Sequence, residues 1–115
     1  MNRRAKGYIA EETAVAFLKK KGYRIIARNV KSAGVEVDVI AEEGGDLVFV
    51  EVKSSDTAFA APAERVTPRQ MHRYVTAAKG YVQSRNLFGV NVRFDVAEVT
   101  ACGVNVIVNA FDAAR

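Results

Sequence analysis

The sequence has few of the residues on which common metal and redox sites are built. Its 115 residues include one cysteine, Cys102, one histidine, His72, and no tryptophan. A single cysteine cannot form an intramolecular disulfide and argues against cysteine-based zinc sites. A lone histidine argues against His-rich metal sites and against most Ser–His or Cys–His catalytic arrangements. The remaining candidates for a functional site are the acidic and basic residues.

The sequence also lacks a long apolar run. No segment is long and apolar enough to span a membrane, and the basic start "MNRRAKGYIAEE" has no apolar stretch behind it that would make a secretory signal. We therefore expect a soluble cytoplasmic protein with no membrane partner. The length suits a single domain over residues 1–115, and a hydrophobic content of 50% is enough for a core without disulfides.

The net charge is only modestly positive, at +4. This excess is compatible with a nucleic-acid partner, but a solvated surface of mixed charge explains it equally well. The basic residues gather at the N-terminus, at the end of the first predicted helix and along a later helix. They are Arg3, Arg4 and Lys6, then Lys19, Lys20 and Lys21, then Arg65, Arg69, His72, Arg73 and Lys79.

The spacing of apolar residues predicts two helices and five strands. Helices are expected from Lys6 to Lys21 and from Thr67 onward, where Thr-Pro-x-Gln is a capping box with Gln70 at its third helical position. The first helix carries Glu11 on or beside its apolar face. A loop is expected over residues 54–66. The predicted strands cover residues 23–30, 35–41, 47–53, 90–99 and 104–111.

This order of elements predicts an α/β fold. An antiparallel meander of three strands is followed by a crossover helix and two more strands, which gives a mixed sheet flanked by helices.

The stretch "LVFVEVK" places Glu51 and Lys53 two residues apart, on one face of an otherwise apolar strand. If the hairpin turns between Gly44 and Gly45, Asp38 lies opposite Glu51, and Glu36 lies opposite Lys53. A loop of odd length would instead put Asp38 and Glu51 on opposite faces, so the hypothesis depends on the register.

With the even register, Asp38, Glu51 and Lys53 form one cluster, which Glu11 could join. Two opposed carboxylates destabilise a sheet unless a cation or a shared proton lies between them. Oxygen ligands of this kind suit Mg²⁺ or Mn²⁺, and phosphodiester hydrolysis is the chemistry they favour. The alternative is a solvated polar face, in which Glu36 and Lys53 form a simple ion pair.

Five motifs occur in an order that resembles a known family. They are "AEETAVAFL", "GYRIIARN", "VEVDVIA", "LVFVEVK" and "RFDVAEV". The set is similar to the bacterial YraN-like family within the PD-(D/E)xK nuclease superfamily, which has the restriction-endonuclease-like fold. The resemblance runs from about Gly7 to Val99. Departures include Val35 in place of a glycine, Ser55 in place of a basic residue and Gln70 in place of a lysine.

The resemblance implies a catalytic core of Asp38, Glu51 and Lys53, with Glu11, Asp38 and Glu51 as ligands of Mg²⁺ or Mn²⁺. It implies a nuclease that acts on nucleic acid, more readily on DNA than on RNA. The oligomeric state is left open, and a homodimer is one possibility. We add residues of the second helix as candidate nucleic-acid contacts, namely Arg69, Gln70 and Arg73. Two alternatives remain, a non-catalytic nucleic-acid-binding module on the same scaffold and an interaction protein in which the charged cluster is structural.

Overall fold

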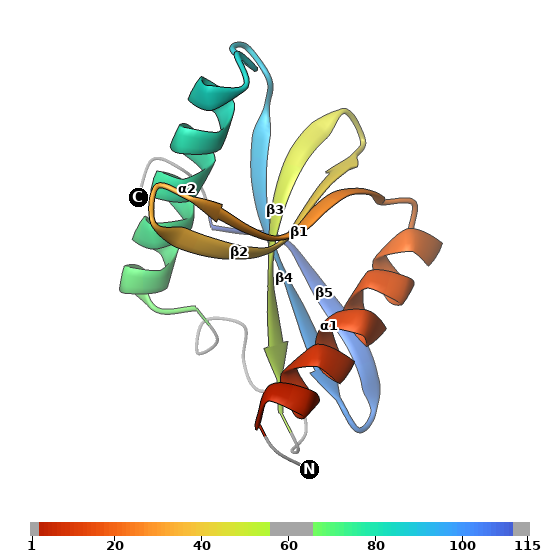
Figure 1. The fold of residues 1–115 in the computed structure, drawn as a ribbon. Helices are drawn as coiled ribbons and strands as arrows, with labels where there is room; N and C mark the ends of the chain where they lie inside the picture. Colours follow the sequence, from red (N-terminus) through yellow and green to blue (C-terminus); the bar gives the residue numbers. More distant parts are fainter. Residues whose placement is uncertain (1–2, 56–65, 112–115) are drawn as a thin grey trace.

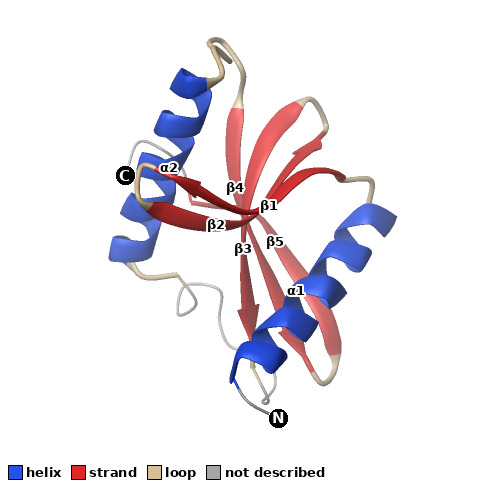
Figure 2. Cartoon of the chain, in the orientation of Figure 1, coloured by secondary structure: helices blue, strands red, loops and turns tan. Residues whose placement is uncertain are grey.

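The structure, a computed structural model, describes residues 3–55 and 66–111. Two helices and five strands follow one another in the predicted order (Figures 1 and 2). They are α1 (Arg3–Lys20), β1 (Arg24–Ser32), β2 (Val35–Glu43), β3 (Asp46–Ser54), α2 (Pro68–Ser84), β4 (Val92–Thr100) and β5 (Gly103–Phe111). Most of the predicted loop over residues 54–66 lies outside the described residues. Neither helix in the described ranges has a stretch long and apolar enough to cross a membrane.

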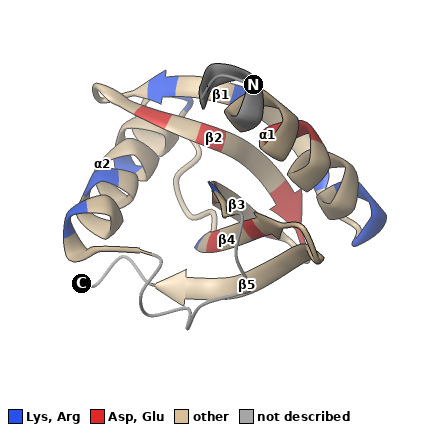
Figure 3. Ribbon diagram, turned by 90° about the horizontal axis from the view of Figure 1, so that it is seen from below, with Lys and Arg blue, Asp and Glu red and all other residues tan. Residues whose placement is uncertain are grey.

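The five strands form one mixed sheet in the order β1-β2-β3-β4-β5. Neighbouring strands are antiparallel except β3 and β4, which are parallel because α2 makes the crossover between them. The predicted fold class, a meander followed by a crossover helix, is therefore confirmed. The two helices flank the sheet at separate places, which is clearest when the molecule is seen from below (Figure 3).

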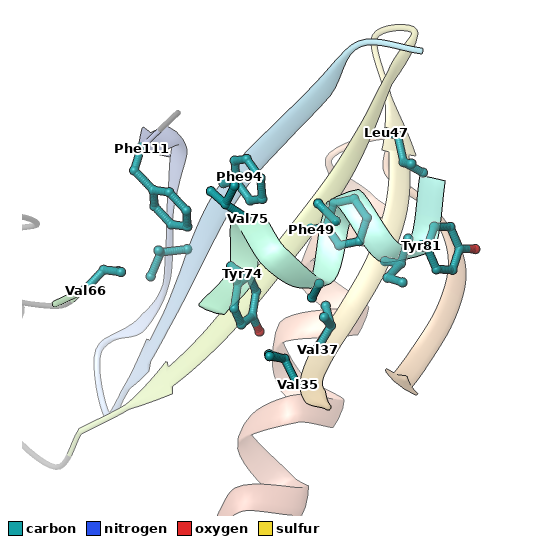
Figure 4. Packing of buried hydrophobic residues seen from close by; sticks show 14 residues of the cluster. Val35, Val37, Leu47, Phe49, Val66, Tyr74, Val75, Tyr81, Phe94 and Phe111 are labelled. Carbon is teal, nitrogen blue, oxygen red and sulfur yellow. The ribbon is translucent and has the colours of Figure 1, made fainter. Parts of the chain in front are cut away.

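The central strand β3 is covered on both faces. Leu47 and Phe49 belong to a cluster under α2, while Val48 and Val50 belong to a second cluster under α1. In the α2 cluster Phe49 meets Tyr81 edge to face, with ring centroids 5.7 Å apart (Figure 4). Burial on both faces explains why this strand reads as a continuous apolar run until Glu51.

Helix α2 begins as its sequence predicts. The backbone N–H of Gln70 donates to Thr67 Oγ1 at 3.2 Å, and Gln70 Oε1 accepts from the Thr67 backbone N–H at 3.0 Å. Pro68 occupies the first turn, where no backbone N–H is needed. The cap fixes where α2 starts, and therefore where its first turn meets the sheet.

The β2–β3 hairpin has the even register. Glu43 pairs with Asp46, and the pairing continues without a shift to Val39 opposite Val50. Gly44 and Gly45 both have positive φ, 60° and 85°, which suits the tight two-residue turn between right-twisted strands.

Past the Val39–Val50 pair the two strands separate. The residues of β2 before Val39 pair with β1 alone, and the residues of β3 after Val50 pair with β4 alone. Figure 1 shows the β1–β2 hairpin curving away from the rest of the sheet. Val37 packs under α2 and Val39 under α1, although residues two apart on a regular strand share a face. Strand β2 therefore turns sharply about Asp38. We call the place where β2 and β3 separate, at Asp38 and Glu51, the fork.

Candidate active site

The predicted acidic pair lies at the fork. Asp38 and Glu51 are the residues directly beyond the last β2–β3 pair, Val39 and Val50. Asp38 Oδ2 accepts a 2.8 Å hydrogen bond from the backbone N–H of Val52, so the Asp38 side chain holds β3 where backbone pairing has ended.

Tyr74 of α2 makes a second link at the fork. Its hydroxyl accepts a hydrogen bond from the Asp38 backbone N–H at 3.2 Å and donates to the Val50 carbonyl at 3.4 Å. The side chain belongs to the apolar cluster under α2 (Figure 4) and is only 4% exposed. Burial raises the pKa of Tyr74 far above its ordinary value, and the Asp38 and Glu51 carboxylates raise it further. The hydroxyl therefore stays protonated and able to donate.

The electrostatics of Asp38 are those of a crowded acidic site. Burial raises the pKa of Asp38 to about 7, with a further rise from the charge of Glu51 and smaller ones from Glu11 and Glu36. The hydrogen bond from Val52 opposes this rise because it favours the charged carboxylate. A cation placed beside Asp38 and Glu51 would relieve the same repulsion.

Lys53 lies beside Glu51 on the same strand. Its Nζ is 3.8 Å from Glu51 Oε1, and the two side chains are 25% and 19% exposed. The β2–β3 pairing ends at Val39 and Val50, before Glu36 and Lys53 would meet, because β2 has already left β3. Lys53 therefore belongs with Glu51, and the alternative cross-strand pair with Glu36 has no place in this ladder.

Two hollows open at the fork, one toward each helix. The hollow toward α2 has a volume of about 190 Å³ and is lined by Val35, Glu36, Glu51, Gln70, Arg73 and Tyr74. The hollow toward α1 has about 180 Å³ and is lined by Gly7, Ala10, Glu11, Asn29, Glu36, Asp38, Val52 and Ser54. Glu36 lines both, whereas Asp38 and Glu51 line one each.

Glu11 reaches the hollow that contains Asp38, but its carboxylate is already engaged. Glu11 Oε1 accepts from Arg28 Nη2 at 3.0 Å, from Arg28 Nε at 3.2 Å and from Asn29 Nδ2 at 2.9 Å. Arg28 also forms an ion pair with Glu12, and both carboxylates raise the Arg28 pKa. The Glu11 carboxylate is therefore bonded to β1, although its charge still contributes to the raised pKa of Asp38.

The carboxylates of Asp38 and Glu51 are the candidate metal ligands at the fork. Within the described part of the chain, no three His, Cys, Asp or Glu side chains lie close enough together to hold a metal ion. Magnesium in proteins is commonly held by one or two carboxylates and keeps several waters, so Asp38 and Glu51 are a sufficient donor set. Glu11 shares a hollow with Asp38, but its carboxylate is bonded to Arg28 and Asn29.

The three residues predicted to contact nucleic acid lie at the start of α2. Gln70 and Arg73 line the hollow with Glu51, and Arg69 is exposed. The side chain of Gln70 also serves the helix cap. Figure 3 shows the basic segments of α2 next to the acidic segments of β2.

The helical spacing of Tyr74 indicates only a core position, and no motif of the sequence assigns a role to Arg28 or Asn29. Asn29 has a positive φ of 52°, an unusual backbone conformation that the structure shows and the sequence does not. Arg28 and Tyr74 carry no signal of their own, because their partners come from other elements.

A second charged cluster surrounds Arg93 on β4, within the "RFDV" motif. Arg93 Nη2 is 3.0 Å from Asp95 Oδ2 and 2.8 Å from Glu43 Oε1, and Nη1 is 3.1 Å from Asp46 Oδ2. Tyr23 donates to Asp95 Oδ2 at 2.6 Å. Asp95 is fully buried, and these acids raise the Arg93 pKa. The cluster joins β4 to the β2–β3 turn and is structural.

Comparison with known proteins identifies the family. The model of the "Uncharacterised protein family UPF0102" matches residues 10–99. This chain belongs to the UPF0102 family. A UPF0102 protein of Persephonella marina is 37% identical over 108 residues, with 93% of each chain covered. One from Caldicellulosiruptor saccharolyticus is 41% identical over 118 residues, covering 96% of this chain and all of that one.

Among solved structures, SfsA of Pyrococcus furiosus in complex with Ca²⁺ is a distant match. The two chains share 18% identity at a TM-score of 0.36, with 93% of the UPF0102 chain and 62% of the other covered.

Proposed function

We propose that this UPF0102 protein is a metal-dependent nuclease that hydrolyses phosphodiester bonds of nucleic acid, DNA more readily than RNA. The observation that carries the proposal is the fork, where Asp38 and Glu51 lie directly beyond the last β2–β3 pair and Lys53 lies 3.8 Å from Glu51. The similarity of the ordered motifs to PD-(D/E)xK nucleases supports the same residues in the same roles.

Each side chain has a task that its position allows. Asp38 and Glu51 would hold Mg²⁺ or Mn²⁺, which supplies polarisation of the phosphoryl group and a more acidic attacking water. The Lys53 ammonium, next to Glu51, would stabilise the negative charge that develops on the phosphate. Arg73 lines the hollow with Glu51 and would contact a neighbouring phosphate of the strand.

A cleavage assay tests the proposal. Labelled single-stranded, duplex, flapped and four-way DNA and one RNA are incubated with Mg²⁺, Mn²⁺ or EDTA. Cutting is expected with metal only, and Asp38→Asn and Glu51→Gln should each abolish it. The matched control is Glu42→Gln, an exposed acid on the same strand as Asp38 whose partner is Arg24. Cutting that survives in both site variants would show a contaminant and remove the support for a nuclease.

A second candidate function is a non-catalytic nucleic-acid-binding module. It is favoured by the hydrogen bonds that already occupy the Glu11 carboxylate. Arg28 and Asn29 engage this carboxylate, and the described residues hold no cluster of three potential ligands. Such a module would shift the mobility of DNA in a salt-sensitive way without cutting it in any metal. The same panel of substrates, run as gel shifts at two salt concentrations, separates the two functions.

A further inference from the structure

In the described part of the chain, side chains of Asp38 and Tyr74 link the two strands of the acidic pair beyond their last backbone pair. One link is the hydrogen bond from the Val52 N–H to Asp38 Oδ2, and the other is the Tyr74 hydroxyl between the Asp38 N–H and the Val50 carbonyl. The first link uses the carboxylate itself. The Tyr74 link acts on the backbone beside both carboxylates, and the Tyr74 hydroxyl also lies within hydrogen-bonding reach of the Glu51 side chain.

Tyr74 is held firmly enough to fix this geometry. Its ring is buried in the cluster under α2, together with Val75 and Phe49. Its helix is anchored by the capping box at Thr67. A buried ring on a packed helix has little freedom, so the hydroxyl defines the position of both backbone groups that it contacts.

The burial of Tyr74 also argues against a direct chemical role for its hydroxyl. At 4% exposure, with its hydroxyl engaged by two backbone groups and by Glu51, it is poorly placed to touch a phosphate or to deliver a proton. Its influence on the chemistry must pass through Asp38 and through Glu51, the neighbour of Val50.

We propose that Tyr74 is a positioning residue, whose hydroxyl joins β2 to β3 at the fork and sets the separation of the Asp38 and Glu51 carboxylates for a divalent cation. This inference rests on the proposed metal site. It assigns to α2 a role in assembling that site, beyond contact with nucleic acid.

The test compares Tyr74→Phe with Tyr81→Phe. Each removes one hydroxyl from a buried tyrosine of α2 and keeps the ring in the same cluster, but only Tyr74 reaches the fork. Mn²⁺ binding is measured by calorimetry on the full chain, and amide hydrogen exchange is followed at Asp38. Tyr74→Phe is expected to weaken Mn²⁺ binding roughly tenfold, since the Asp38 N–H and the Val50 carbonyl lose their shared bond to the hydroxyl and the two carboxylates are held less firmly. It should also speed exchange of the Asp38 amide, while Tyr81→Phe changes neither.

The outcomes separate this inference from the proposed function. If the wild-type chain binds Mn²⁺ but cuts no nucleic acid, the nuclease proposal fails and the affinities of the two variants still decide the role of Tyr74. If the wild-type chain cuts and Tyr74→Phe has an unchanged Mn²⁺ affinity, the role of Tyr74 is overturned alone. An equal loss in both variants would reduce it to general packing, and a wild-type chain that binds no Mn²⁺ would overturn both proposals.

Discussion

The carboxylate of Asp38 accepts a hydrogen bond from the backbone N–H of Val52, 14 residues further along the chain, at 2.8 Å. The contact lies at the point where the β2–β3 ladder ends, so a side-chain hydrogen bond joins the two strands where backbone pairing stops. It orients Asp38 beside Glu51 and leaves the Asp38 carboxylate close to a second negative charge. The same feature therefore stabilises the fork and makes it a place where a cation would be stabilised.

The raised pKa of Asp38 predicts a pH-dependent stability in metal-free solution. The pKa of Asp38 is about 7 in the folded chain, and its ordinary value is 3.8. Between these values the folded state holds a proton that the unfolded state has lost, so this group makes the free energy of unfolding fall as the pH rises from about 4 to 7. The slope from one group is at most about 1.4 kcal/mol per pH unit.

Denaturant unfolding in EDTA at several pH values from 4 to 8 measures this effect. Asp38→Asn keeps an oxygen for the Val52 N–H but cannot titrate. The difference between its free energy of unfolding and that of the wild type should therefore shift in its favour as the pH rises and level off above about 7. Glu42→Gln, on the exposed part of the same strand, should follow the wild-type curve. A constant difference between Asp38→Asn and the wild type across this range would contradict the shifted pKa.

Metal binding to the acidic pair predicts stabilisation by Mn²⁺. A ligand that binds only the folded state at ten times its dissociation constant adds about 1.4 kcal/mol, which raises the melting temperature of a chain this size by several degrees. Thermal melts with and without Mn²⁺ should show this rise in the wild type and in Glu42→Gln. Asp38→Asn and Glu51→Gln should lose it, and a rise that persists in both would place the metal elsewhere.

Lys53 should matter for the reaction more than for metal binding. Its Nζ lies on the Glu51 side of the fork, and removal of one group that stabilises developing charge commonly lowers turnover by about 10² to 10³. Lys53→Met should therefore reduce cleavage by that factor while Mn²⁺ still raises the melting temperature. Lys19→Met, an exposed lysine near the end of α1, is the control. Full activity in Lys53→Met would remove lysine from the catalytic set.

Much of the fold was predictable because its signals are local. Alternation marked β2 and β4, Gly44 and Gly45 marked the turn, and Thr67 with Gln70 marked the start of α2, and each was confirmed. The register followed from the turn alone, since a two-residue loop leaves only one way for the strands to pair. The position of Asp38 and Glu51 at the end of the β2–β3 ladder could therefore be expected from the sequence, although the backbone pairing stops one pair before them.

The parts that could not be predicted depend on contacts between distant elements. The spacing of Tyr74 shows that it faces the core, but only the position of α2 over the fork shows that its hydroxyl meets Asp38 and Val50. Likewise, the carboxylate of Glu11 meets Arg28 because α1 crosses β1, which no periodicity reveals. The departure of β2 from β3 at Asp38 is a change of strand direction, and the alternating residues on either side do not encode it.

The buried Arg93 cluster predicts the largest loss of stability. The Arg93 side chain is 11% exposed and forms ion pairs with Asp46, Glu43 and the fully buried Asp95. Arg93→Ala would leave the Asp95 carboxylate in the core with the Tyr23 hydroxyl and the Asn109 backbone N–H as its remaining hydrogen-bond donors among the described residues. Breaking a buried pair from one side commonly costs about 3–5 kcal/mol of unfolding free energy.

Arg24→Ala is the matched control for Arg93→Ala. Arg24 pairs with Glu42 at 3.0 Å, the same distance as between Arg93 and Asp95, but its two side chains are 69% and 51% exposed. Loss of the Arg24 pair should therefore lower the free energy of unfolding by less than about 1 kcal/mol. Urea unfolding of both variants at pH 7 measures the contrast. Equal costs would mean that the Arg93 cluster is as well solvated as a surface pair. A large cost for Arg93→Ala alone would show that the "RFDV" motif serves the fold, because β4 is joined through it to the turn that sets the register of Asp38 and Glu51.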